Sequence, residues 1–222
     1  MKRFAIIVAG GQGTRMQGTL PKQFLPINGE PILAHTLRRF AHQGLELILV
    51  MHKDYIHYWE EQCNFLFNIP AHRIVAGGKT RAASVKNGLS TIHEEGLVAI
   101  HDAARPLCTS ELIERLFTAA GEHGSAIPVI LCRDTLREIT ASGSRTVPRD
   151  NFRAVQTPQV FSISPLKKAF LLPDNEHFTD EASLFEAAGQ SVHLEAGEES
   201  NIKITVPSDL LLAAAYLKEF SK

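Results

Sequence analysis

The sequence predicts an α/β fold with a twisted, mostly parallel sheet that is covered by helices on both faces. Its apolar runs are short and nearly continuous, as in strands that are buried on both sides. Longer stretches with apolar residues at helical spacing separate these runs, and this alternation indicates strand–helix–strand units. The chain has 222 residues, of which 44% are hydrophobic and 21% charged, as in a globular protein. We therefore expect a single domain over residues 1–222.

Five apolar runs in the first part of the chain predict strands. Because parallel sheets bind ligands beyond the carboxyl ends of their strands, the residues that follow each run are candidates for a site. The runs are Phe4–Val8, Leu45–Met51, Ile74–Ala76, Leu97–Ile100 and Ala126–Leu131.

The stretches between these runs predict helices. The clearest begins at Pro31, since proline suits the first turn, and its apolar residues recur on one face up to Phe40. The predicted helices are Pro31–Phe40, Tyr55–Phe65, Arg81–His93 and Ser110–Glu122.

The last part of the chain predicts shorter elements. Its final helix opens with Ser208 and Asp209, which suit the positive end of a helix dipole. The predicted order is an element at Val155–Ser162, helices at Ser164–Phe170 and Thr179–Ala188, strands at Val192–Glu195 and Ile202–Val206, and a helix at Pro207–Phe220.

The segment Asp134–Gln156 interrupts this alternation. Leu136–Ile139 and Arg145–Pro148 flank the turn-like Thr140–Ser144, a pattern that predicts a two-stranded excursion. A lone hairpin is only marginally stable in water, so this arm is expected to pack on something. The residues leave open whether it contacts a second subunit or is an ordinary surface hairpin on its own subunit.

Charge and cysteine content disfavour several classes of protein. The net charge is -1, so no overall basic field would attract a nucleic acid. The three cysteines are far apart and form no Cys-x-x-Cys motif, which fits a reducing compartment. No apolar run reaches the roughly 20 residues of a membrane span, and the N-terminus shows no signal-peptide pattern. We expect a cytoplasmic protein with neither a nucleic-acid nor a membrane partner.

The stretch IIVAGGQGTRMQGTLPKQFLP, from Ile6 to Pro26, is the most informative motif. Glycines at a strand end expose backbone N–H groups, and two cations beside such amides make a binding site for a polyphosphate. The motif therefore predicts an enzyme that handles a nucleotide. Its candidate residues are Gly10, Gly11, Gly13, Arg15 and Lys22.

This glycine loop differs from two familiar nucleotide motifs. The third position after Gly13 is Met16, which breaks a Rossmann fingerprint, and no Gly-Lys-Ser/Thr follows as in a Walker loop. Arg15 can instead hold two phosphate oxygens at once. The alternative is a glycine-rich turn with a surface arginine. Lys22 favours the phosphate site, because it is fixed between Pro21 and an apolar anchor.

An acidic residue, Asp102, comes just after the fourth predicted strand, in the segment His101–Pro106. A carboxylate at a strand end beside a phosphate site is where Mg²⁺ would be held. The alternative for Asp102 is a helix cap or an ion pair with Arg105. Arg105 itself either stabilises this loop or touches phosphate.

Three further positions are candidates. At Gly77 and Gly78, small residues would let the backbone approach a flat base, and Ser84 could hydrogen-bond a base edge, unless this is a plain helix start capped by Thr80. Lys203 alternates with its isoleucine neighbours and either faces solvent or adds a third cation to the cleft. The stretch Thr179–Ser183 resembles a capping box.

Together these motifs resemble the 2-C-methyl-D-erythritol 4-phosphate cytidylyltransferase family, from Ile6 to about Leu217. Each motif alone is weak, and their shared order makes the resemblance specific. The motifs are the glycine loop with Arg15, Pro21–Leu25, Gly77–Gly78 with Ser84, His101–Pro106, Thr157–Gln159, Thr179–Ser183 and Asn201–Lys203.

The resemblance implies a nucleotidyltransferase (Rossmann-like) fold and a homodimer. Its projecting β-arm, here at about 134–153, would reach into the partner's active site. By motif position, Arg149 would bind the sugar phosphate of the neighbouring subunit. The family usually has an acidic residue before this arginine, whereas Pro148 stands here, so Arg153 competes for the role.

The implied reaction joins CTP and 2-C-methyl-D-erythritol 4-phosphate and releases pyrophosphate. Lys79 stands where an acidic residue is common, so no side-chain contact to the base is assigned there. The implied roles are the α-phosphate and leaving group for Arg15 and Lys22, the α-phosphate for Lys203, Mg²⁺ for Asp102, ribose and phosphates for the backbone from Ala9 through Gly10 and Gly11 to Gly13, cytosine for Gly77, Gly78 and Ser84, and the sugar-alcohol phosphate for Arg149 and Thr179, with Arg105 as a further candidate.

Three alternatives remain open on the sequence. Ribitol-5-phosphate cytidylyltransferase shares the scaffold and most motifs. A sugar-1-phosphate nucleotidyltransferase would use UTP or GTP. A non-catalytic nucleotide-binding module would be expected to lose a charged residue of the site, whereas Arg15, Lys22, Asp102 and Lys203 are all present.

Overall fold

The computed structural model describes residues 1–10, 20–41, 44–63, 67–173 and 178–219. Within these ranges, eight strands form one sheet in the order β10-β7-β11-β6-β1-β4-β5, with β12 paired to β7. The strands β6, β1, β4 and β5 run parallel, and β11 is antiparallel to both β6 and β7. The strands are β1 (Lys2–Ala9), β4 (Glu46–Met51), β5 (Arg73–Ala76), β6 (Gly96–Asp102), β7 (Ser125–Leu131), β10 (Arg153–Val155), β11 (Gln159–Ser162) and β12 (Leu194–Ala196).

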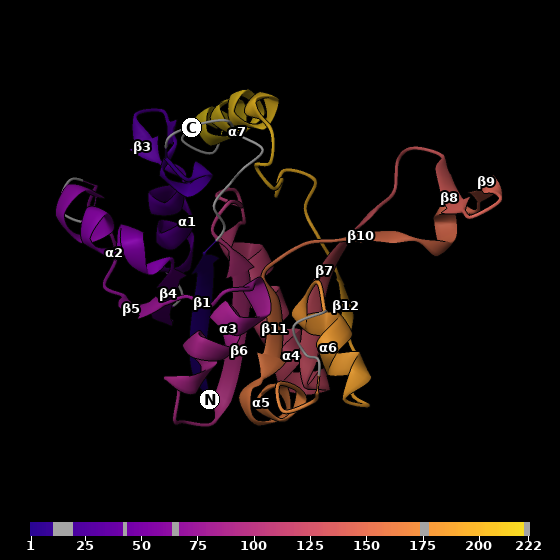
Figure 1. The fold of residues 1–222 in the computed structure, drawn as a ribbon, viewed down its shortest axis with the longest axis horizontal. Coiled ribbons are helices and arrows are strands. Elements are labelled where there is room, and N and C mark those ends of the chain that lie inside the picture. The colour runs from indigo at the N-terminus through magenta and orange to yellow at the C-terminus, as the bar shows by residue number, and fades with distance from the viewer. Residues whose placement is uncertain (11–19, 42–43, 64–66, 174–177, 220–222) are drawn as a thin grey trace.

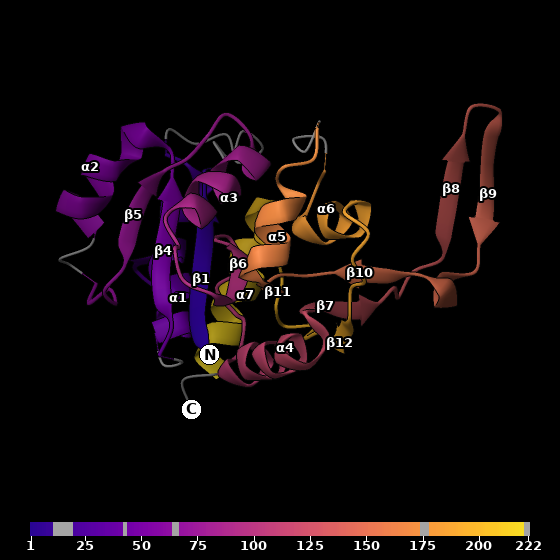
Figure 2. The same ribbon diagram turned by 90° about the horizontal axis from the view of Figure 1, so that it is seen from below.

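Helices cover both faces of this sheet, because its central strands are apolar on both sides. In β1, Ala5 and Ile7 pack under α1 and α4, whereas Phe4 and Ile6 pack under α3, α5 and α6. Figure 2 shows these two groups of helices on opposite sides of the sheet. The helices are α1 (Ile32–Ala41), α2 (Ile56–Tyr58), α3 (Arg81–Ser90), α4 (Ser110–His123), α5 (Ile163–Ala169), α6 (Glu181–Ala187) and α7 (Pro207–Glu219).

The five predicted strands of the first part are confirmed, with ends that differ by at most two residues. The helix predicted at Tyr55–Phe65 is divided into α2 and a wider helical turn at Trp59–Cys63, and Phe65 lies outside the described residues. The helix predicted at Arg81–His93 ends at Ser90. The element at Val155–Ser162 consists of the end of β10 and all of β11, with a break between them.

The predicted strand Ile202–Val206 is wrong. The segment joins no ladder, because several of its amides are satisfied elsewhere. The amide of Ile202 donates to the Ser200 carbonyl, and the amides of Thr205 and Val206 both donate to the carboxylate of Asp209 in the first turn of α7. A single backbone bond from Ile204 to the Ala104 carbonyl, 2.9 Å long, ties the segment to the loop after β6. Residue 220, the predicted end of the last helix, lies outside the described residues.

The predicted excursion forms a hairpin of β8 (Leu136–Thr140) and β9 (Gly143–Val147), which pair with each other in a sheet of their own. Figure 1 shows this arm extending away from the main sheet, to which β7 and β10 connect it. Ile139, on β8, is 79% exposed, and Phe152, before β10, is 44% exposed. The arm thus exposes large apolar side chains that its own chain does not cover.

The remaining described elements lie at the periphery. A short ribbon of β2 (Pro26–Ile27) and β3 (Glu30–Pro31) precedes α1.

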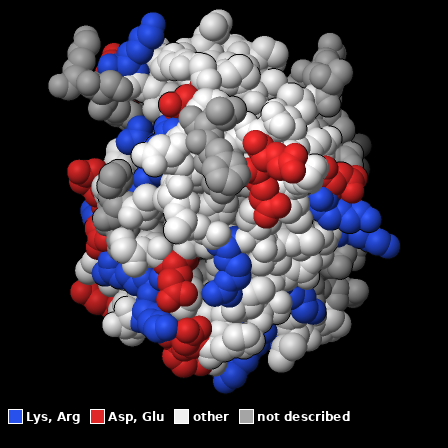
Figure 3. Space-filling model, turned by 90° about the vertical axis from the view of Figure 1, so that its left-hand side faces the viewer, with Lys and Arg blue, Asp and Glu red and all other residues white. Residues whose placement is uncertain are grey.

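On the face shown in Figure 3, lysines and arginines are interspersed with acidic side chains instead of gathering into one basic field. None of the helices in the described ranges has both the length and the apolar character that a membrane span requires.

Candidate active site

A cavity of about 580 Å³ opens at the carboxyl edge of the parallel strands. Its walls come from the ends of β1 and β6, the residue after β4, the first turn of α3 and two lysines from separate segments, Lys22 and Lys203. This is the edge at which ligands of open α/β sheets bind. The cavity is therefore the candidate site.

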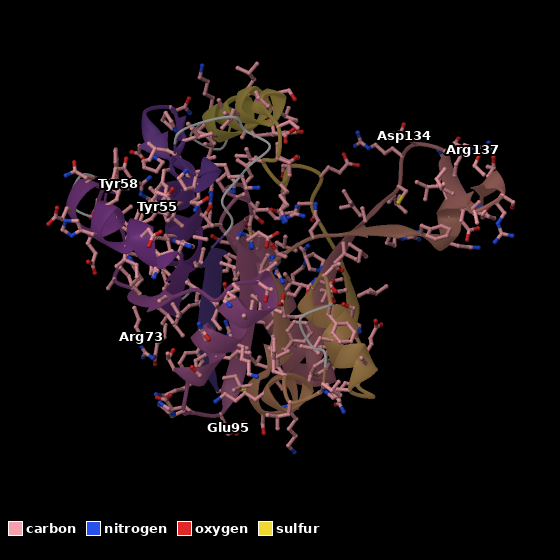
Figure 4. The ribbon with its side chains drawn as sticks, viewed as in Figure 1. Tyr55, Tyr58, Arg73, Glu95, Asp134 and Arg137 are labelled. Carbon is pink, nitrogen blue, oxygen red and sulfur yellow. The ribbon has the colours of Figure 1, made fainter. Side chains whose placement is uncertain are left out.

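Lys22 is held at the cavity by the short helical turn Lys22–Phe24. The next residue, Gln23, is buried and donates to the Ala9 carbonyl at the end of β1, over 2.8 Å. Phe24 is 5% exposed and packs against Tyr55 and Tyr58, with ring centroids 5.5 and 5.2 Å away. Figure 4 labels both tyrosines beside α2. With its neighbours anchored, Lys22 reaches the cavity and donates from Nζ to the Ile204 carbonyl at 2.9 Å.

Asp102, the last residue of β6, is surrounded by cations. Lys203 Nζ lies 2.7 Å from its Oδ2, Arg81 Nε lies 3.3 Å from its Oδ1, and Arg105 Nε lies 4.0 Å from Oδ2. Burial alone would raise the pKa of Asp102, but the charges of Arg81 and Lys203 outweigh it and hold this pKa far below its usual range. The cavity thus contains a carboxylate that stays ionised at neutral pH.

The residue before Asp102 fixes the backbone of this strand end. His101 is fully buried, and its Nε2 lies 3.0 Å from the Arg105 carbonyl. Because a carbonyl only accepts, Nε2 carries the hydrogen, and Nδ1 accepts from the Thr157 hydroxyl at 3.2 Å. Thr157 Oγ1 in turn accepts from the Asp102 amide at 3.1 Å. Burial lowers the pKa of His101 to about 4, so the ring is neutral at pH 7.

The junction from β5 to α3 requires its glycines. A Cβ on Gly78 would lie 2.5 Å from the Ala83 Cβ, which is closer than real side chains approach. Ser84 closes the turn, because its Oγ donates to the Thr80 carbonyl at 2.9 Å and accepts from the Gly78 amide at 3.1 Å. Thr80 caps α3 by accepting from the Ala83 amide at 3.0 Å. Ser84 and Gly78 both line the cavity.

The cavity brings together many of the predicted site residues. Arg105 is outside its lining and donates to the Asn201 carbonyl at 2.7 Å. Thr179 is exposed, just before the helix cap Asp180. Arg149 lies at the base of the arm, where it donates to the Arg133 carbonyl at 2.5 Å. Those in the lining are Ala9, Gly10, Lys22, Gly78, Ser84, Asp102 and Lys203; Gly77 adjoins the lining, and Gly11, Gly13 and Arg15 lie outside the described residues.

Sequence reasoning missed Arg81, which lines the cavity and contacts Asp102. A signal for it exists in the sequence. An arginine in the first turn of a helix opposes the helix dipole, and the first turn of α3 contains no acidic residue. Such an arginine needs carboxylates from elsewhere in the fold. His52 and Lys79 also line the cavity without having been assigned a role.

Magnesium is the predicted cofactor, and the cavity offers it one carboxylate. Across the described residues, no group of three His, Cys, Asp or Glu side chains could hold a metal ion. Mg²⁺ commonly binds through one or two carboxylates together with substrate phosphates and water. The ionised Asp102 therefore fits a magnesium ion that arrives with a nucleotide, rather than one that the protein holds alone.

Comparison with known proteins agrees with this geometry. The family model for 2-C-methyl-D-erythritol 4-phosphate cytidylyltransferase matches residues 4–219. Relatives with that name from Bacteroides thetaiotaomicron and Bacteroides fragilis are 45% and 46% identical, and each alignment covers 98% of this chain and 100% of the relative. The crystal structure of the protein with that name from Thermus thermophilus superposes with a TM-score of 0.82 at 33% identity, over 98% of this chain and 100% of the other. These matches confirm the predicted nucleotidyltransferase-like fold, and the chain belongs to the 2-C-methyl-D-erythritol 4-phosphate cytidylyltransferase family.

Proposed function

We propose that this chain transfers the cytidylyl group of CTP to 2-C-methyl-D-erythritol 4-phosphate and releases pyrophosphate. The observation that carries the proposal is the convergence of Lys22 and Lys203 with Asp102 in one cavity at the carboxyl edge of the sheet. Family membership supports it, because the relatives bear the name of this activity. The same names favour methylerythritol phosphate over ribitol 5-phosphate as the acceptor.

The chemical difficulty of this reaction is electrostatic. An oxygen of the acceptor phosphate attacks the α-phosphorus of CTP in line. The bond from that phosphorus to the oxygen that bridges the α- and β-phosphates breaks, and pyrophosphate leaves with this oxygen. Cations must neutralise the charge that gathers at the α-phosphate and on the departing pyrophosphate. A phosphate monoester is largely dianionic near neutral pH, since its second pKa is about 6, so no general base is needed.

The two lysines are suited to this task because they reach the cavity from different segments. Lys22 comes from the turn after the glycine loop, and Lys203 comes from the segment before α7. We assign Lys203 to the α-phosphate and Lys22, with Arg15, to the α-phosphate and the leaving group. Asp102 would hold Mg²⁺, which supplies further neutralisation of phosphate charge when it is bound.

The nucleotide would lie along the ends of β1 and β5. We assign ribose and phosphates to the backbone from Ala9 to Gly13 and the cytosine to Gly77, Gly78 and Ser84. Gly78 and Ser84 both line the cavity at the start of α3, which supports the assignment of the base to this end of the cavity.

The acceptor phosphate is assigned to Thr179 and to Arg149. Arg149 lies at the base of the arm and is not part of the cavity of its own chain, so this role requires a second subunit. We therefore propose a homodimer in which each arm completes the site of its partner. The exposed apolar side chains of the arm, among them Ile139, support this arrangement. In this assignment, Arg105 has a structural role, because it donates to the Asn201 carbonyl and holds that segment in place.

The cysteines bear on where the reaction takes place. Cys63, Cys108 and Cys132 are all free thiols, in keeping with a reducing compartment. We propose the cytoplasm as the location.

A pyrophosphate-release assay tests the proposed function. The purified chain is incubated with Mg²⁺, one of CTP, UTP or GTP, and either methylerythritol 4-phosphate or ribitol 5-phosphate. We expect release with CTP and methylerythritol phosphate, at a kcat/KM at least about tenfold above every other pair. Equal or better turnover with ribitol phosphate, or with UTP or GTP, would contradict the assignment. Binding of CTP without turnover of any acceptor would support a non-catalytic module.

A further inference from the structure

Arg81 links the two sides of the cavity through carboxylates from two different elements. It is the first residue of α3, and its Nη1 lies 2.7 Å from Oε1 of Glu181 in the first turn of α6. Its Nε lies 3.3 Å from Oδ1 of Asp102 at the end of β6. A single guanidinium therefore connects the nucleotide side of the cavity, α3, to the helix that follows Thr179, a candidate residue for the acceptor.

Stability alone does not account for this pair. Glu181 is 2% exposed, and its Oε2 is buried without a hydrogen-bond partner among the described residues. Buried ion pairs are often no more stabilising than apolar side chains of similar size, because both charges lose their hydration. A buried carboxylate that is only half satisfied is a poor device for holding two helices together. Its position behind a cavity-lining arginine suggests that it acts on the site.

We propose that Glu181 and Arg81 are positioning residues for Asp102, an inference that rests on the proposed function. Glu181 holds the guanidinium in place and balances its charge, so that Arg81 orients Asp102 through Oδ1. The other oxygen, Oδ2, accepts from Lys203 Nζ at 2.7 Å and lies at a longer 4.0 Å from Arg105 Nε. Oδ2 is then the exchangeable oxygen, which is released when Lys203 turns to a phosphate.

Hydrogen bonds also fix the first turn of α6, which contains Glu181. Asp180 caps α6 by accepting from the Ser183 amide at 3.0 Å, and it also accepts from Gln159 Nε2 at 3.0 Å. Gln159 Oε1 accepts from the Ala182 amide at 3.1 Å. The first turn of α6 is thus anchored to β11, and Glu181 offers Arg81 a rigid partner. The arginine consequently has one fixed contact and one contact that serves Asp102.

The net charge of the Arg81–Glu181 pair distinguishes the positioning role from a purely structural one. With Glu181 ionised, the Arg81–Glu181 pair is neutral and adds no net charge to the cavity. Replacing Glu181 by glutamine keeps the size of the side chain and one acceptor oxygen, but it leaves the charge of Arg81 unbalanced. The extra positive charge would attract CTP more strongly while Asp102 is less well oriented for turnover.

The test compares Glu181→Gln with wild type and with Glu186→Gln, an exposed position on the same helix. Steady-state kinetics give kcat and KM, calorimetry gives the Kd for CTP without metal, and thermal unfolding reports the fold. We expect Glu181→Gln to lower kcat about 10–100-fold, the usual effect of a lost orienting contact behind a ligand. We expect its metal-free Kd for CTP to fall by about threefold or more. Glu186→Gln should match wild type in all three.

A double variant tests whether Glu181 acts through Arg81. In that case, Arg81→Met combined with Glu181→Gln should lose no more turnover than Arg81→Met alone. Additive losses would overturn the proposal, as would a Glu181→Gln enzyme with kcat within twofold of the Glu186→Gln control. Weaker CTP binding in Glu181→Gln, in step with its lower kcat, would also overturn it. Should the wild type turn over no acceptor, the proposed function fails, and the metal-free Kd comparison still decides the role of the pair.

Discussion

Lys203 Nζ lies 2.7 Å from Asp102 Oδ2, although the two residues come from segments far apart in the chain. Their ion pair lies in the wall of the cavity, where Lys203 is partly exposed and Asp102 is nearly buried. A polyphosphate that enters would offer Lys203 a partner of higher charge. The lysine is thus held within reach of the substrate by a carboxylate from which it can be released.

The first prediction concerns Lys22, a second lysine in the lining of the cavity. Lys22→Ala removes a charge that the proposed mechanism uses at the α-phosphate and leaving group, so kcat should fall at least about 10²-fold. The anchors Gln23 and Phe24 remain, and thermal unfolding should therefore show an intact fold. Lys86→Ala, at an exposed position on α3, is the control and should retain full turnover. A Lys22→Ala enzyme with a nearly normal kcat would refute the role.

The second prediction concerns the pH dependence of stability and depends on His101. The unfolded imidazole binds a proton below about pH 6.5, whereas burial lowers the folded pKa to about 4. Between these values the unfolded state binds more protons, so stability is lost as the pH falls through this window. From pH 7 to 5, His101 should contribute a loss of about 2 kcal/mol in the free energy of unfolding.

Urea unfolding at several pH values from 7 to 5 measures this effect. His101→Gln should lose less stability over that interval than wild type does. Burial also lowers the pKa of His35, so some dependence on pH remains in the variant. His57→Gln, at a position with a largely exposed side chain, should behave as wild type. An unchanged pH slope in His101→Gln would show that another group is responsible.

The third prediction contrasts two glycines inside helices. A Cβ at Gly121 in α4 would meet only the Leu97 Cδ1 at 3.9 Å, so Gly121→Ala should stabilise the protein by about 0.5–1 kcal/mol. A Cβ at Gly88 in α3 would lie 2.9 Å from Val50 Cγ2 and 3.1 Å from Ile6 Cγ2. These branched side chains are fully buried and have little room to move, so Gly88→Ala should destabilise by about 1–3 kcal/mol.

Denaturant unfolding of both variants measures whether each substitution raises or lowers the free energy of unfolding. Because the propensity gain is the same at both positions, a difference between them isolates the effect of packing. Stabilisation by Gly88→Ala would mean that α3 can move away from the sheet, contrary to the packing seen. The activity of Gly121→Ala should be unchanged, since this residue lies near the end of α4 and is not among the residues that line the cavity.

The strands near the site were predictable because each is an apolar run that ends at a polar or glycine residue. A buried strand needs no alternation, so β1 and β6 are evident from composition alone, and Gly10 and Asp102 follow as residues of the carboxyl edge. The sequence does not show which side chain forms an ion pair with each charged residue of the site. The role of Arg81 depends on Glu181, which meets it only through the packing of α6 beside α3.

Lys203 lines the cavity, although the strand predicted around it is wrong. The alternation of Ile202–Val206 predicted Lys203 on the face opposite its isoleucine neighbours, and Ile204 is buried while Lys203 lines the cavity, but the segment is no strand. Its amides are taken by Ser200 and Asp209, contacts that depend on the loop before and the helix after it. Side-chain alternation requires only an extended backbone, whereas a ladder requires a free neighbouring strand.

The last prediction tests the proposed dimer, in which Arg149 of one subunit serves the cavity of the other. Lys22→Ala and Arg149→Ala should each be nearly inactive alone, for different reasons. When the two variants are co-expressed with different tags, about half of the dimers are mixed, and in each of these one site combines an intact Lys22 with an intact arm. About a quarter of all sites should then be restored.

Purified mixed dimers make the outcome unambiguous. We expect close to half of the wild-type kcat per dimer, because one of the two sites is complete, together with a normal KM for the acceptor phosphate. Arg153→Ala, assayed alone beside Arg149→Ala, distinguishes the two arginines at the base of the arm, since only loss of the true ligand should inactivate the homodimer and then be rescued in mixed dimers with Lys22→Ala. If Arg149 served its own chain instead, both sites of a mixed dimer would be defective and its activity would stay at the level of the single variants. The geometry favours the shared site, because Arg149 lies at the base of the arm and is absent from the lining of its own cavity.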